Sequence, residues 1–565
     1  MNLFKVVVSL ILSAFYIPIH AQFFTHPHYP QGYFEWPVRA TIGLVANFGE
    51  LRPNHYHMGL DCQTEQKQNL PVLAAADGYI AKVKIEPSGF GRAIYINHPN
   101  GLTTLYGHLN DFNPALEKYV KEQQYKLKSW KIFLDIPASI FPVHKGDFIA
   151  YSGNTGGSQG PHVHFEIRDT KTEKVLNPSL FGFPIIDHVP PVIQHLAVYN
   201  RNISTYEQHP KMYDIKKEDG VYMTTPELIL CNTNKVSFAI ATYDTYSGST
   251  NKNGIFEAVL YDDEVPVSQF QINSIGYDET RYENAHIDYK LRSSGGPFVE
   301  HLSKLPGYIN SIYTSSGTDG IIELRDNTKH AIKIIVKDAD GNASTLNFTI
   351  QRSALSEESI AVSKQKDFLP GYVNVFENNN ISFYLPENAL YDSIRFQFSE
   401  LQTATEFPIY QLHNTSVPVH VYFPVSIKAI SLLPNKMVMH HFANGKDVYA
   451  KAAFEKGWYT ASFREFGHFQ LMIDTIPPTI NPVGFKNGMN CSKLNHLAFV
   501  ISDNTEEIKE FTATLDGNWL RFSNDKGRTF IYTFDEMCPD GAHELKIIAK
   551  DLVGNVTEKV YHFIR

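Results

Sequence analysis

An internal repeat constrains the fold of this chain more than any other sequence feature. Residues 330–352 (HAIKIIVKDADGNASTLNFTIQR) align without gaps to residues 543–565 (HELKIIAKDLVGNVTEKVYHFIR), with nine identities in 23 positions. Each copy reads as two strands joined by a turn that contains Gly-Asn. Upstream, DHVPPVI (187–193) resembles DTIPPTI (474–480), and CNTNKVSFAI from Cys231 resembles CSKLNHLAFVI from Cys491. The repeat therefore predicts two related β-sandwiches.

The repeat and the changes in composition divide the chain. We expect a signal peptide at 1–21, a first domain at 22–186, a β-sandwich with an insertion at 187–352, a β-rich region without the repeat signature at 353–473, and a second β-sandwich at 474–565. Frequent tyrosine, phenylalanine and proline favour β-rich domains with many turns. The expected fold class is mainly β, with Ig-like sandwiches after an N-terminal antiparallel-sheet domain.

The first 21 residues indicate export. Lys5 supplies a positive charge, residues 6–17 form an apolar run, and Ala21 is a small residue at the expected cut. A short membrane anchor is the alternative, but the run is shorter than the roughly 18 apolar residues that a span needs. No later stretch is long enough to span a bilayer, so we expect no transmembrane segment in the mature chain and a location in the periplasm or cell envelope.

Charge and cysteine content exclude two classes of protein. With 50 basic and 59 acidic residues the formal net charge is −9, which argues against nucleic-acid binding. Four cysteines cannot form a disulfide framework in a chain this long. Pairing of Cys491 with Cys538 stays open. Asp338, Asp340 and Asn342 resemble part of a calcium loop, but the second copy has Val553 at the middle position, so we interpret this segment as a turn.

Histidines and acids gather in two segments of the first domain. In HVHFEIR (162–168), alternation places His162 and His164 on one strand face, roughly 6–7 Å apart. We expect that face to be polar and outward, with Glu166 and Arg168 on a solvated edge or orienting a ligand. In HYHMGLD (55–61), Gly59 argues against a helix, so a loop entering a strand presents the His-Asp pair. Two histidines and one aspartate would leave zinc an open fourth position, the pattern of a catalytic site.

These motifs resemble a known family. HMGLD (57–61), YGHL (106–109) and GNTG…GPHVHFE (153–166) resemble, in order, the signatures of the lysostaphin/LytM-like zinc endopeptidases, which cut peptide cross-links in bacterial peptidoglycan. The resemblance covers roughly 40–185. It implies one Zn²⁺ held by His57, Asp61 and His164, with His108 and His162 as the catalytic histidines.

The resemblance also marks a departure. Between His108 and Lys145 lie 36 residues, more than the short connection typical of the family. This insertion (111–142) contains a predicted helix at 114–132, with Asn113 as its cap, Pro114 in its first turn, and apolar residues at helical spacing. Those apolar residues are Leu116, Val120, Leu127 and Trp130. The insertion is expected to be a lid or wall of the cleft, or a dock for a partner or for the β-domains.

The expected function is an exported zinc endopeptidase whose partner is a peptidoglycan stem peptide or cross-link. Two alternatives stay open: a catalytically silent or latent scaffold that activates other wall hydrolases, and an endopeptidase that acts on a non-wall protein. The β-domains could also bind a protein partner. The expected minor residues are Tyr106, facing the cleft; His55, beside His57; and His98 and His144, in loops.

Overall fold

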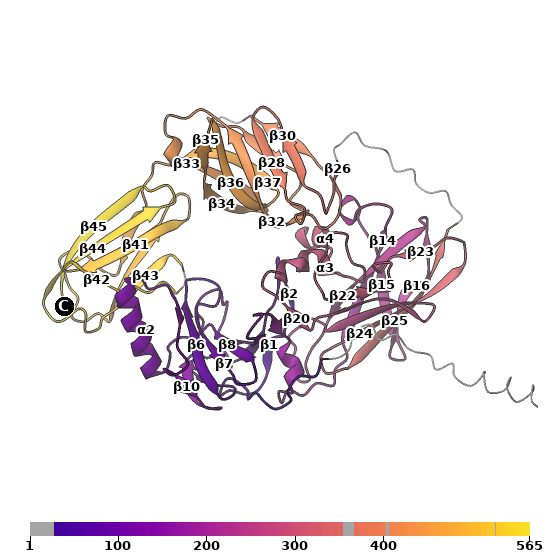
Figure 1. Cartoon of the computed structure of the whole chain (residues 1–565), viewed down its shortest axis with the longest axis horizontal. Helices are drawn as coiled ribbons and strands as arrows, with labels where there is room; N and C mark the ends of the chain where they lie inside the picture. Colours follow the sequence, from indigo (N-terminus) through magenta and orange to yellow (C-terminus); the bar gives the residue numbers. More distant parts are fainter. Residues whose placement is uncertain (1–26, 354–366, 403–405, 526) are drawn as a thin grey trace, which may run out of the picture.

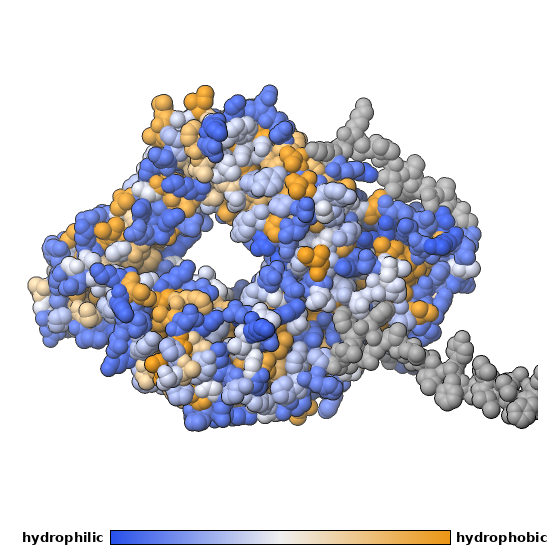
Figure 2. All heavy atoms as spheres, in the orientation of Figure 1, coloured by the Kyte–Doolittle hydropathy of each residue, from blue (hydrophilic) through white to orange (hydrophobic). Residues whose placement is uncertain are grey.

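The computed structural model describes residues 27–353, 367–402, 406–525 and 527–565, so the predicted signal peptide lies outside the described residues. The fold is mainly β, as expected, with one long helix in the N-terminal part. Four lobes follow one another around a central opening, which the space-filling view shows clearly (Figures 1 and 2). We call them lobes one (27–186), two (187–353), three (367–473) and four (474–565). None of the described helices has the length and apolar character that a membrane crossing requires.

Lobe one is built on an antiparallel sheet with the strand order β1-β4-β12-β8-β7-β6-β10. A two-stranded sheet, β11-β5, and the pair β2-β3 flank it, and its apolar core is built from residues of the seven-strand path and of β5 and β11. The strands are β1 (Leu44–Ala46), β2 (Leu51–Arg52), β3 (His55–Tyr56), β4 (Leu60–Gln63), β5 (Pro71–Leu73), β6 (Gly78–Ile85), β7 (Arg92–Asn97), β8 (Leu102–Gly107), β9 (Ile132–Asp135), β10 (Pro142–Val143), β11 (Phe148–Tyr151), β12 (His162–Asp169) and β13 (Val175–Leu176), followed by the 3₁₀ helix η1 (Pro178–Phe181).

The insertion forms the helix α2 (Pro114–Leu127). The Asn113 side chain accepts a hydrogen bond from the Leu116 backbone N–H, which confirms the predicted cap. Leu116 and Val120 are buried, but Leu127 is 57% exposed, so residues at the predicted helical spacing do not all lie on a buried face. The helix ends at Leu127 because Lys128 adopts a left-handed conformation (φ 50°) and turns the chain away. Trp130 is buried beyond the helix rather than on it.

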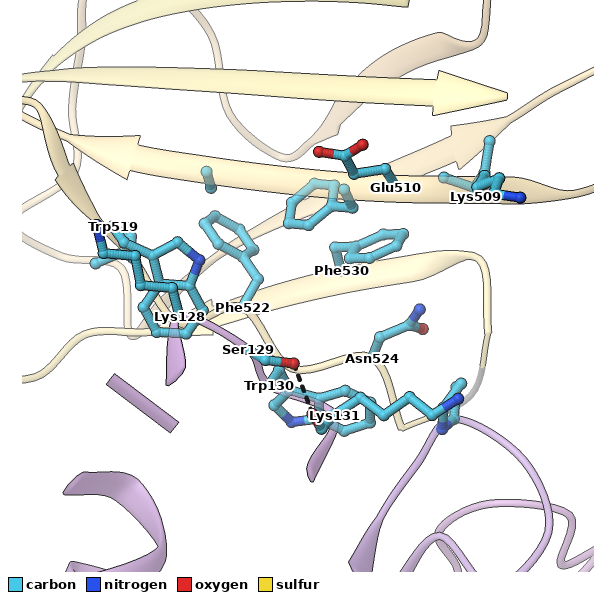
Figure 3. Close-up of a pocket in the computed structure, with 15 residues that line it drawn as sticks. Lys128, Ser129, Trp130, Lys131, Lys509, Glu510, Trp519, Phe522, Asn524 and Phe530 are labelled. Carbon is cyan, nitrogen blue, oxygen red and sulfur yellow. Dashed lines mark hydrogen bonds between the residues drawn. The ribbon is translucent and has the colours of Figure 1, made fainter. Parts of the chain in front are cut away.

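Helix α2 docks lobe four. Lys121 Nζ lies 2.8 Å from an Asp535 carboxylate oxygen, and Arg521 donates to the Gln124 side chain at 2.9 Å. Between the end of the helix and lobe four lies a cavity of about 310 Å³, lined by aromatic residues that include Trp130, Trp519 and Phe530 (Figure 3). From the sequence, the insertion is expected to be a lid or wall of the cleft, or a dock for a partner or a β-domain. These contacts show that it docks a β-domain, lobe four.

Lobe two consists of one continuous 11-stranded sheet with the order β21-β17-β14-β15-β16-β25-β24-β18-β19-β22, joined by β23 on β17. Its elements are β14 (Val192–Asn200), η2 (Thr205–Glu207), β15 (Lys211–Glu218), β16 (Val221–Cys231), β17 (Lys235–Tyr243), β18 (Glu257–Asp262), β19 (Val265–Gln271), β20 (Ser274–Ile275), η3 (Thr280–Tyr282), α3 (Glu283–His286), α4 (Tyr289–Ser293), β21 (Glu300–His301), β22 (Tyr313–Ser315), β23 (Ile322–Glu323), β24 (Lys329–Lys337) and β25 (Ala343–Arg352).

Lobes one and two share a core. Phe48, Tyr56 and Met58 of lobe one pack into the apolar cluster of lobe two. Strand β13 of lobe one pairs with β20 of lobe two and so extends the first sheet across the boundary. Burial of this common surface fixes the two lobes against each other.

Lobe three packs two five-stranded sheets, with the orders β27-β28-β32-β36-β35 and β30-β31-β37-β33-β34, around one apolar core. Its elements are β26 (Asp367–Phe368), β27 (Asn374–Glu377), β28 (Ile381–Leu385), β29 (Ile394–Arg395), β30 (Phe398–Leu401), β31 (Ile409–Leu412), β32 (Pro418–Lys428), η4 (Pro434–Lys436), β33 (Met437–Ala443), β34 (Lys446–Lys451), β35 (Ala453–Glu455), β36 (Trp458–Glu465) and β37 (Gly467–Ile473).

Lobe four packs a three-stranded sheet, β38-β40-β43, against a five-stranded sheet, β39-β45-β44-β41-β42. Its strands are β38 (Thr479–Val483), β39 (Met489–Asn490), β40 (His496–Ser502), β41 (Ile508–Leu515), β42 (Asn518–Trp519), β43 (Thr529–Thr533), β44 (Ala542–Asp551) and β45 (Val556–Ile564).

The repeated segments fold alike. Each forms two antiparallel strands and a turn, β24-β25 in lobe two and β44-β45 in lobe four, as predicted. The upstream segments match too: β16, which ends at Cys231, runs parallel to β25, and β39, which ends just before Cys491, runs parallel to β45. All four cysteines are free and buried, so the pairing of Cys491 with Cys538 does not occur in this structure.

Buried histidines predict a loss of stability in mild acid. Burial lowers the pKa of His413 and of His420 to about 4, and that of His301 to about 3. The unfolded chain takes up these protons near pH 6.5, but the folded chain does not. Above pH 6.5 these histidines are neutral in both states and do not change the free energy of unfolding. As the pH falls towards 4, each lowers the free energy of unfolding by up to about 3 kcal/mol.

Calorimetry of the metal-free protein tests this expectation. The unfolding temperature should fall between pH 6.5 and 5.5, where most carboxylates do not titrate. An unfolding temperature that rises or stays constant from pH 6.5 to 5.5 would contradict the predicted neutral state of the three histidines.

Candidate metal centre

Neighbouring strands bring the predicted site residues together. Strand β12 lies between β4 and β8, with His164 opposite Asp61 on one side and opposite Gly107 on the other. His57 lies on the loop between β3 and β4, as the glycine at position 59 predicted. A side chain at Gly59 would meet the His164 ring at 2.9 Å, so only glycine allows the loop to pass this close to β12.

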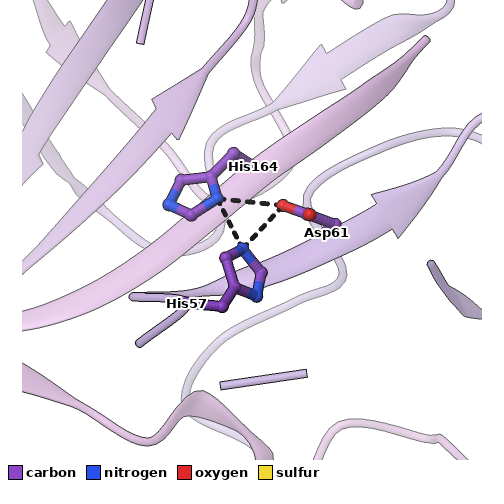
Figure 4. A group of neighbouring side chains, drawn as sticks. All are labelled: His57, Asp61 and His164. Atoms are coloured by element: carbon purple, nitrogen blue, oxygen red, sulfur yellow. Dashed lines mark hydrogen bonds and ion pairs between the residues drawn. The ribbon is translucent and has the colours of Figure 1, made fainter. Parts of the chain in front are cut away.

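Three side-chain atoms converge on one point (Figure 4). His57 Nε2 and His164 Nδ1 each lie 2.9 Å from Asp61 Oδ1, and the two nitrogens are 3.1 Å apart. All three residues are at most 5% exposed. This buried group of two imidazoles and one carboxylate is one that could hold a metal ion.

Two further histidines flank the group. His162, on the same strand face as His164, places Nε2 3.4 Å from Asp61 Oδ1. His108 follows the end of β8 with φ 60°, and its ring centre lies 4.8 Å from that of His162. The structure thus brings all five predicted residues into one site.

Fixed hydrogen bonds orient the four imidazoles. His57 Nδ1–H donates to the Asn47 carbonyl at 2.6 Å and His108 Nδ1–H to the Thr155 carbonyl at 2.9 Å. His162 Nδ1–H donates to the Gly160 carbonyl at 2.8 Å, and His164 Nε2–H donates to Glu166 Oε1 at 2.9 Å. We assign the tautomers from these acceptors. His57, His108 and His162 then each turn an unprotonated nitrogen towards the centre of the site, whereas His164 Nδ1 faces Asp61 Oδ1.

The polar face of β12 is buried, which corrects the expectation of a solvated edge. Glu166 is 0% and Arg168 8% exposed, and Arg168 Nε donates to Glu166 Oε2 at 2.6 Å. The Tyr277 hydroxyl of lobe two donates to Glu166 Oε1 at 2.5 Å, and the Tyr277 ring lies 4.9 Å from the Arg168 guanidinium. Glu166 therefore links His164 to the neighbouring lobe.

Arg52 supports the carboxylate of Asp61. Its Nη2 donates to Asp61 Oδ2 at 2.8 Å, and its Nε to Glu50 at 3.3 Å. Burial by itself raises the pKa of Asp61, but the surrounding histidines outweigh it and hold that pKa well below its usual range. Asp61 is thus ionised, with Oδ2 occupied by Arg52 and Oδ1 left facing His57 and His164.

The electrostatics of the site favour a cation. Burial lowers the pKa of His57 to about 4, so this ring is neutral. Burial also lowers the pKa of His164, but its hydrogen bonds to Asp61 and Glu166 outweigh burial and raise that pKa to about 9. With that pKa His164 is protonated in the metal-free site, and its Nδ1–H donates to Asp61 Oδ1. A metal ion at the centre would replace this proton as the positive charge that the carboxylate faces.

A cleft of about 520 Å³ opens beside the centre. Asp61, His108 and His162 line it together with Arg52 and the glycine-rich segment 157–161. Tyr106, expected to face the cleft, is fully buried, and its hydroxyl accepts from the Ala75 N–H at 2.7 Å; that expectation is wrong because position 106 points to the opposite face of β8.

The remaining histidines of lobe one lie outside the centre. His55 lines the cleft but bonds the Pro53 carbonyl. His98 is buried between Asp77 and Thr104, and His144 is exposed. Sequence reasoning undervalued Glu166 and Arg168, although both lie on the motif strand. It missed Tyr277, for which the sequence carries no signal.

The fold and the site together define a LytM-like peptidase domain. Residues 55–125, within lobe one, match Peptidase family M23, and residues 368–474 match the Zu5-like domain. The chain is 29% identical over 144 residues to the cell division protein DipM of Caulobacter vibrioides, a match that covers 26% of the chain and 19% of DipM. It is 35% identical over 112 residues to the DD-carboxypeptidase/endopeptidase Mpg of Neisseria meningitidis, which covers 20% of each protein.

The chain thus spans about a fifth of the length of these curated relatives. Among solved structures, the catalytic domain of a mutant of the prophage-encoded M23 protein EnpA from Enterococcus faecalis is similar. It is 22% identical, with a TM-score of 0.20, and the match covers 26% of this chain and 96% of that one.

Proposed function

We propose that this protein is an exported zinc endopeptidase that hydrolyses peptide cross-links of bacterial peptidoglycan. One observation carries the proposal: the ligand atoms of His57, Asp61 and His164 converge beside an open cleft, into which His108 and His162 project. The name of Mpg as a carboxypeptidase and endopeptidase supports the reaction class. The name of DipM as a cell division protein and the predicted signal peptide support a location in the cell envelope.

The donor set fits one Zn²⁺. Two imidazole nitrogens and one carboxylate oxygen are ligands that zinc prefers, and three protein ligands leave a position open for catalysis. A tetrahedral ion with bonds of about 2.0–2.1 Å separates its ligand atoms by about 3.3 Å, close to the 2.9 and 3.1 Å between the three atoms here. When bound, zinc supplies Lewis acidity and lowers the pKa of water towards neutrality.

The ligand residues are held before any ion arrives. The Asn47 carbonyl fixes the His57 ring, Arg52 fixes Asp61, and Glu166 fixes His164. Such outer partners set the tautomer and direction of each ligand.

The two flanking histidines perform the proton transfers. Burial and the neighbouring His164 and His162 lower the pKa of His108 to about 3, so its Nε2 is free to accept a hydrogen bond. One of the two rings takes a proton from the attacking water on its unprotonated Nε2 and passes it to the leaving amine; the other can donate to the oxygen that becomes negative at the scissile carbonyl only when its Nε2 is protonated. The glycine-rich wall at 157–160 allows a peptide backbone to lie close to both rings.

Digestion of purified sacculi tests the proposal. The chain without its predicted leader (residues 22–565), loaded with zinc, is expected to release free stem peptides or unlinked dimers that mass spectrometry identifies. The His162→Ala protein, as a matched control, is expected to release none. The fragments name the bond that is cut.

Two outcomes would contradict the proposal. If the zinc-loaded protein releases nothing from sacculi and cuts no unrelated protein, the chain is a silent member of its family. If it cuts an unfolded protein such as casein but leaves sacculi intact, it is an endopeptidase with a target outside the wall.

The Tyr277→Phe protein is expected to bind zinc about tenfold more weakly than the wild type, because loss of an outer hydrogen bond typically costs about 10–100-fold in metal affinity. The hydroxyl of Tyr277 is a donor to Glu166, whereas its ring stays on Arg168. Competition with a zinc indicator measures the change.

Tyr95→Phe is the matched control. The Tyr95 ring also contacts Arg168, at 5.4 Å, but no hydrogen bond links it to Glu166 among the described residues. Its zinc affinity should equal that of the wild type. Equal affinities for all three proteins would exclude a role of lobe two in holding the metal centre.

A further inference from the structure

Two groups of three aspartates lie outside the peptidase site, one in lobe two and one in lobe four. In each group the carboxylate oxygens lie within 4.8 Å of one another. The groups are Asp187, Asp244 and Asp338 in lobe two, and Asp474, Asp503 and Asp551 in lobe four.

The two groups occupy corresponding places in the repeat. Asp187 and Asp474 begin the matching segments DHVPPVI and DTIPPTI. Asp244 directly follows β17, and Asp503 directly follows β40. Asp338 and Asp551 begin the matching turns DADGN and DLVGN between the last two strands of each lobe. Three separate chain segments therefore deliver the same three carboxylates in both copies.

The hydrogen bonds of the first aspartates also correspond. Asp187 Oδ1 accepts from the Val189 N–H at 3.0 Å, and Asp474 Oδ1 accepts from the Ile476 N–H at 3.1 Å. In both residues the second oxygen, Oδ2, is buried without a hydrogen-bond partner.

The third aspartates correspond as well. Asp338 accepts from the backbone N–H and side-chain amide of Asn342, and Asp551 accepts from the same groups of Asn555. The predicted turn at 338–342 therefore forms, and the asparagine closes it. Each carboxylate oxygen keeps a lone pair for a further partner.

Buried oxygens without partners point into both groups. Besides Asp187 Oδ2 and Asp474 Oδ2, the Oδ1 atoms of Asp244 and Asp503 are buried and accept no hydrogen bond. Asp244 and Asp474 are 1% exposed, and Asp187 is 6% exposed. A buried carboxylate oxygen without a donor is costly, so these positions need a cationic or protonated partner.

No basic side chain balances the charge. Among the described residues, none of the six carboxylates forms an ion pair with lysine, arginine or histidine. Lys436 of lobe three donates to the amide oxygen of Asn555 at 2.5 Å rather than to a carboxylate. Burial and the neighbouring Asp338 and Asp187 raise the pKa of Asp244 to about 7, which reflects this uncompensated charge.

We propose that each group of three aspartates binds one Ca²⁺ ion. The ligand atoms are carboxylate oxygens only, which suit a hard cation and lack the nitrogen or sulfur that zinc prefers. Calcium takes six to eight oxygen ligands in flexible geometry, completed by carbonyls and water, whereas Mg²⁺ demands a strict octahedron and gives up its water reluctantly. The donors come from three segments, so this is not a single calcium-binding loop.

The positions of the ions give them a structural role. Asp187 lies in the connection between η1 of lobe one and β14 of lobe two, and Asp474 directly follows β37 of lobe three. An ion at either place ties a lobe junction to a β-hairpin turn of the following lobe. Calcium is therefore expected to protect residues 182–191 and 474–478 from proteolysis.

Calcium titration of the metal-free chain (22–565) tests the proposal. Calorimetry with CaCl₂ should give two ions per chain, with dissociation constants of about 10⁻⁴–10⁻³ M if the sites resemble other extracellular modules. Asp244→Asn and Asp503→Asn should each leave one ion, and the double variant none. His164→Ala should keep both calcium ions, which separates these sites from the peptidase centre.

Unfolding temperatures show whether a variant that binds less calcium is still folded. Without calcium, both Asn variants should unfold at the same temperature as the wild type or higher, because each removes a repelling charge. With millimolar calcium only the wild type and the exposed control Asp214→Asn should show the full rise in unfolding temperature. Failure of the wild type to bind calcium, retention of two ions by the double variant, or equal affinity for Mg²⁺ would each overturn the proposal.

Discussion

The His164→Ala protein is expected to bind no zinc and to release no peptide from sacculi. His164 Nδ1 is one of three converging ligand atoms, 2.9 Å from Asp61 Oδ1 and 3.1 Å from His57 Nε2. The two remaining ligands, His57 and Asp61, are expected to bind zinc too weakly, because a catalytic zinc site normally has three protein ligands. Activity should fall by more than the roughly 10²–10³-fold that loss of a single transition-state donor costs. The same preparation is used for both measurements. Inductively coupled plasma mass spectrometry gives its zinc content, and digestion of sacculi gives the release of fragments.

His144→Ala is the matched control for this variant. His144 belongs to the same lobe, but its side chain is 86% exposed and lies outside the cleft. It should keep both zinc and activity, and both variants should show the circular dichroism of the wild type. Stoichiometric zinc in the His164→Ala protein would remove His164 from the ligand set.

Local features of the sequence predicted part of the site, and the resemblance to the lysostaphin/LytM-like family supplied the full set of five residues. Alternation along HVHFEIR placed His162 and His164 on one face, and both do reach Asp61. Gly59 ruled out a helix, and His57 lies on a loop before β4. Such features depend on neighbours in the chain, so a single sequence carries them.

What surrounds the site could not be predicted, because it depends on contacts between distant segments. Strand β12 has the alternation of a half-exposed strand, yet lobe two covers its polar face with Tyr277, 111 residues from Glu166 in the sequence. Likewise, Leu127 fits the apolar spacing of α2 but lies exposed at its end, whereas the buried Gln124 donates to the Trp130 carbonyl. Periodicity predicts which residues share a face and does not say what covers it.

Contacts between lobes connect the candidate metal centre to the rest of the chain. Lobe two supplies Tyr277 and receives Phe48 and Tyr56 of lobe one in its core. Lobe four reaches the cleft wall, where the Asp525 carbonyl accepts from the Gly156 N–H at 3.1 Å. A truncated chain that ends at residue 186 would lack Tyr277 and the shared core with lobe two. It would also expose the surface around Gly156 that lobe four covers. Enzymatic tests therefore require the full chain.

The His162→Ala protein is expected to keep one zinc ion but lose about 10²–10⁴-fold in kcat, the range that general acid–base groups contribute. His162 Nε2 lies 3.4 Å from Asp61 Oδ1, outside the converging trio, and its ring lines the cleft. His108→Ala should behave in the same way, because its Nδ1–H is held by the Thr155 carbonyl and the ring contacts that of His162. Steady-state kinetics on a cross-linked stem peptide, with zinc measured in parallel, gives both quantities.

The pH dependence of the two variants separates their roles. The variant that lacks the general base should lose the acid limb of the kcat/KM profile, whereas the variant that lacks the oxyanion donor should be slower at every pH with the limb retained. If the two rings act as one unit, the double variant should cost little more than either single change. Full activity of His162→Ala would exclude it from catalysis, and loss of zinc would make it a ligand. Because both histidines flank a centre whose three ligand atoms already converge without them, we expect turnover to change and zinc to stay.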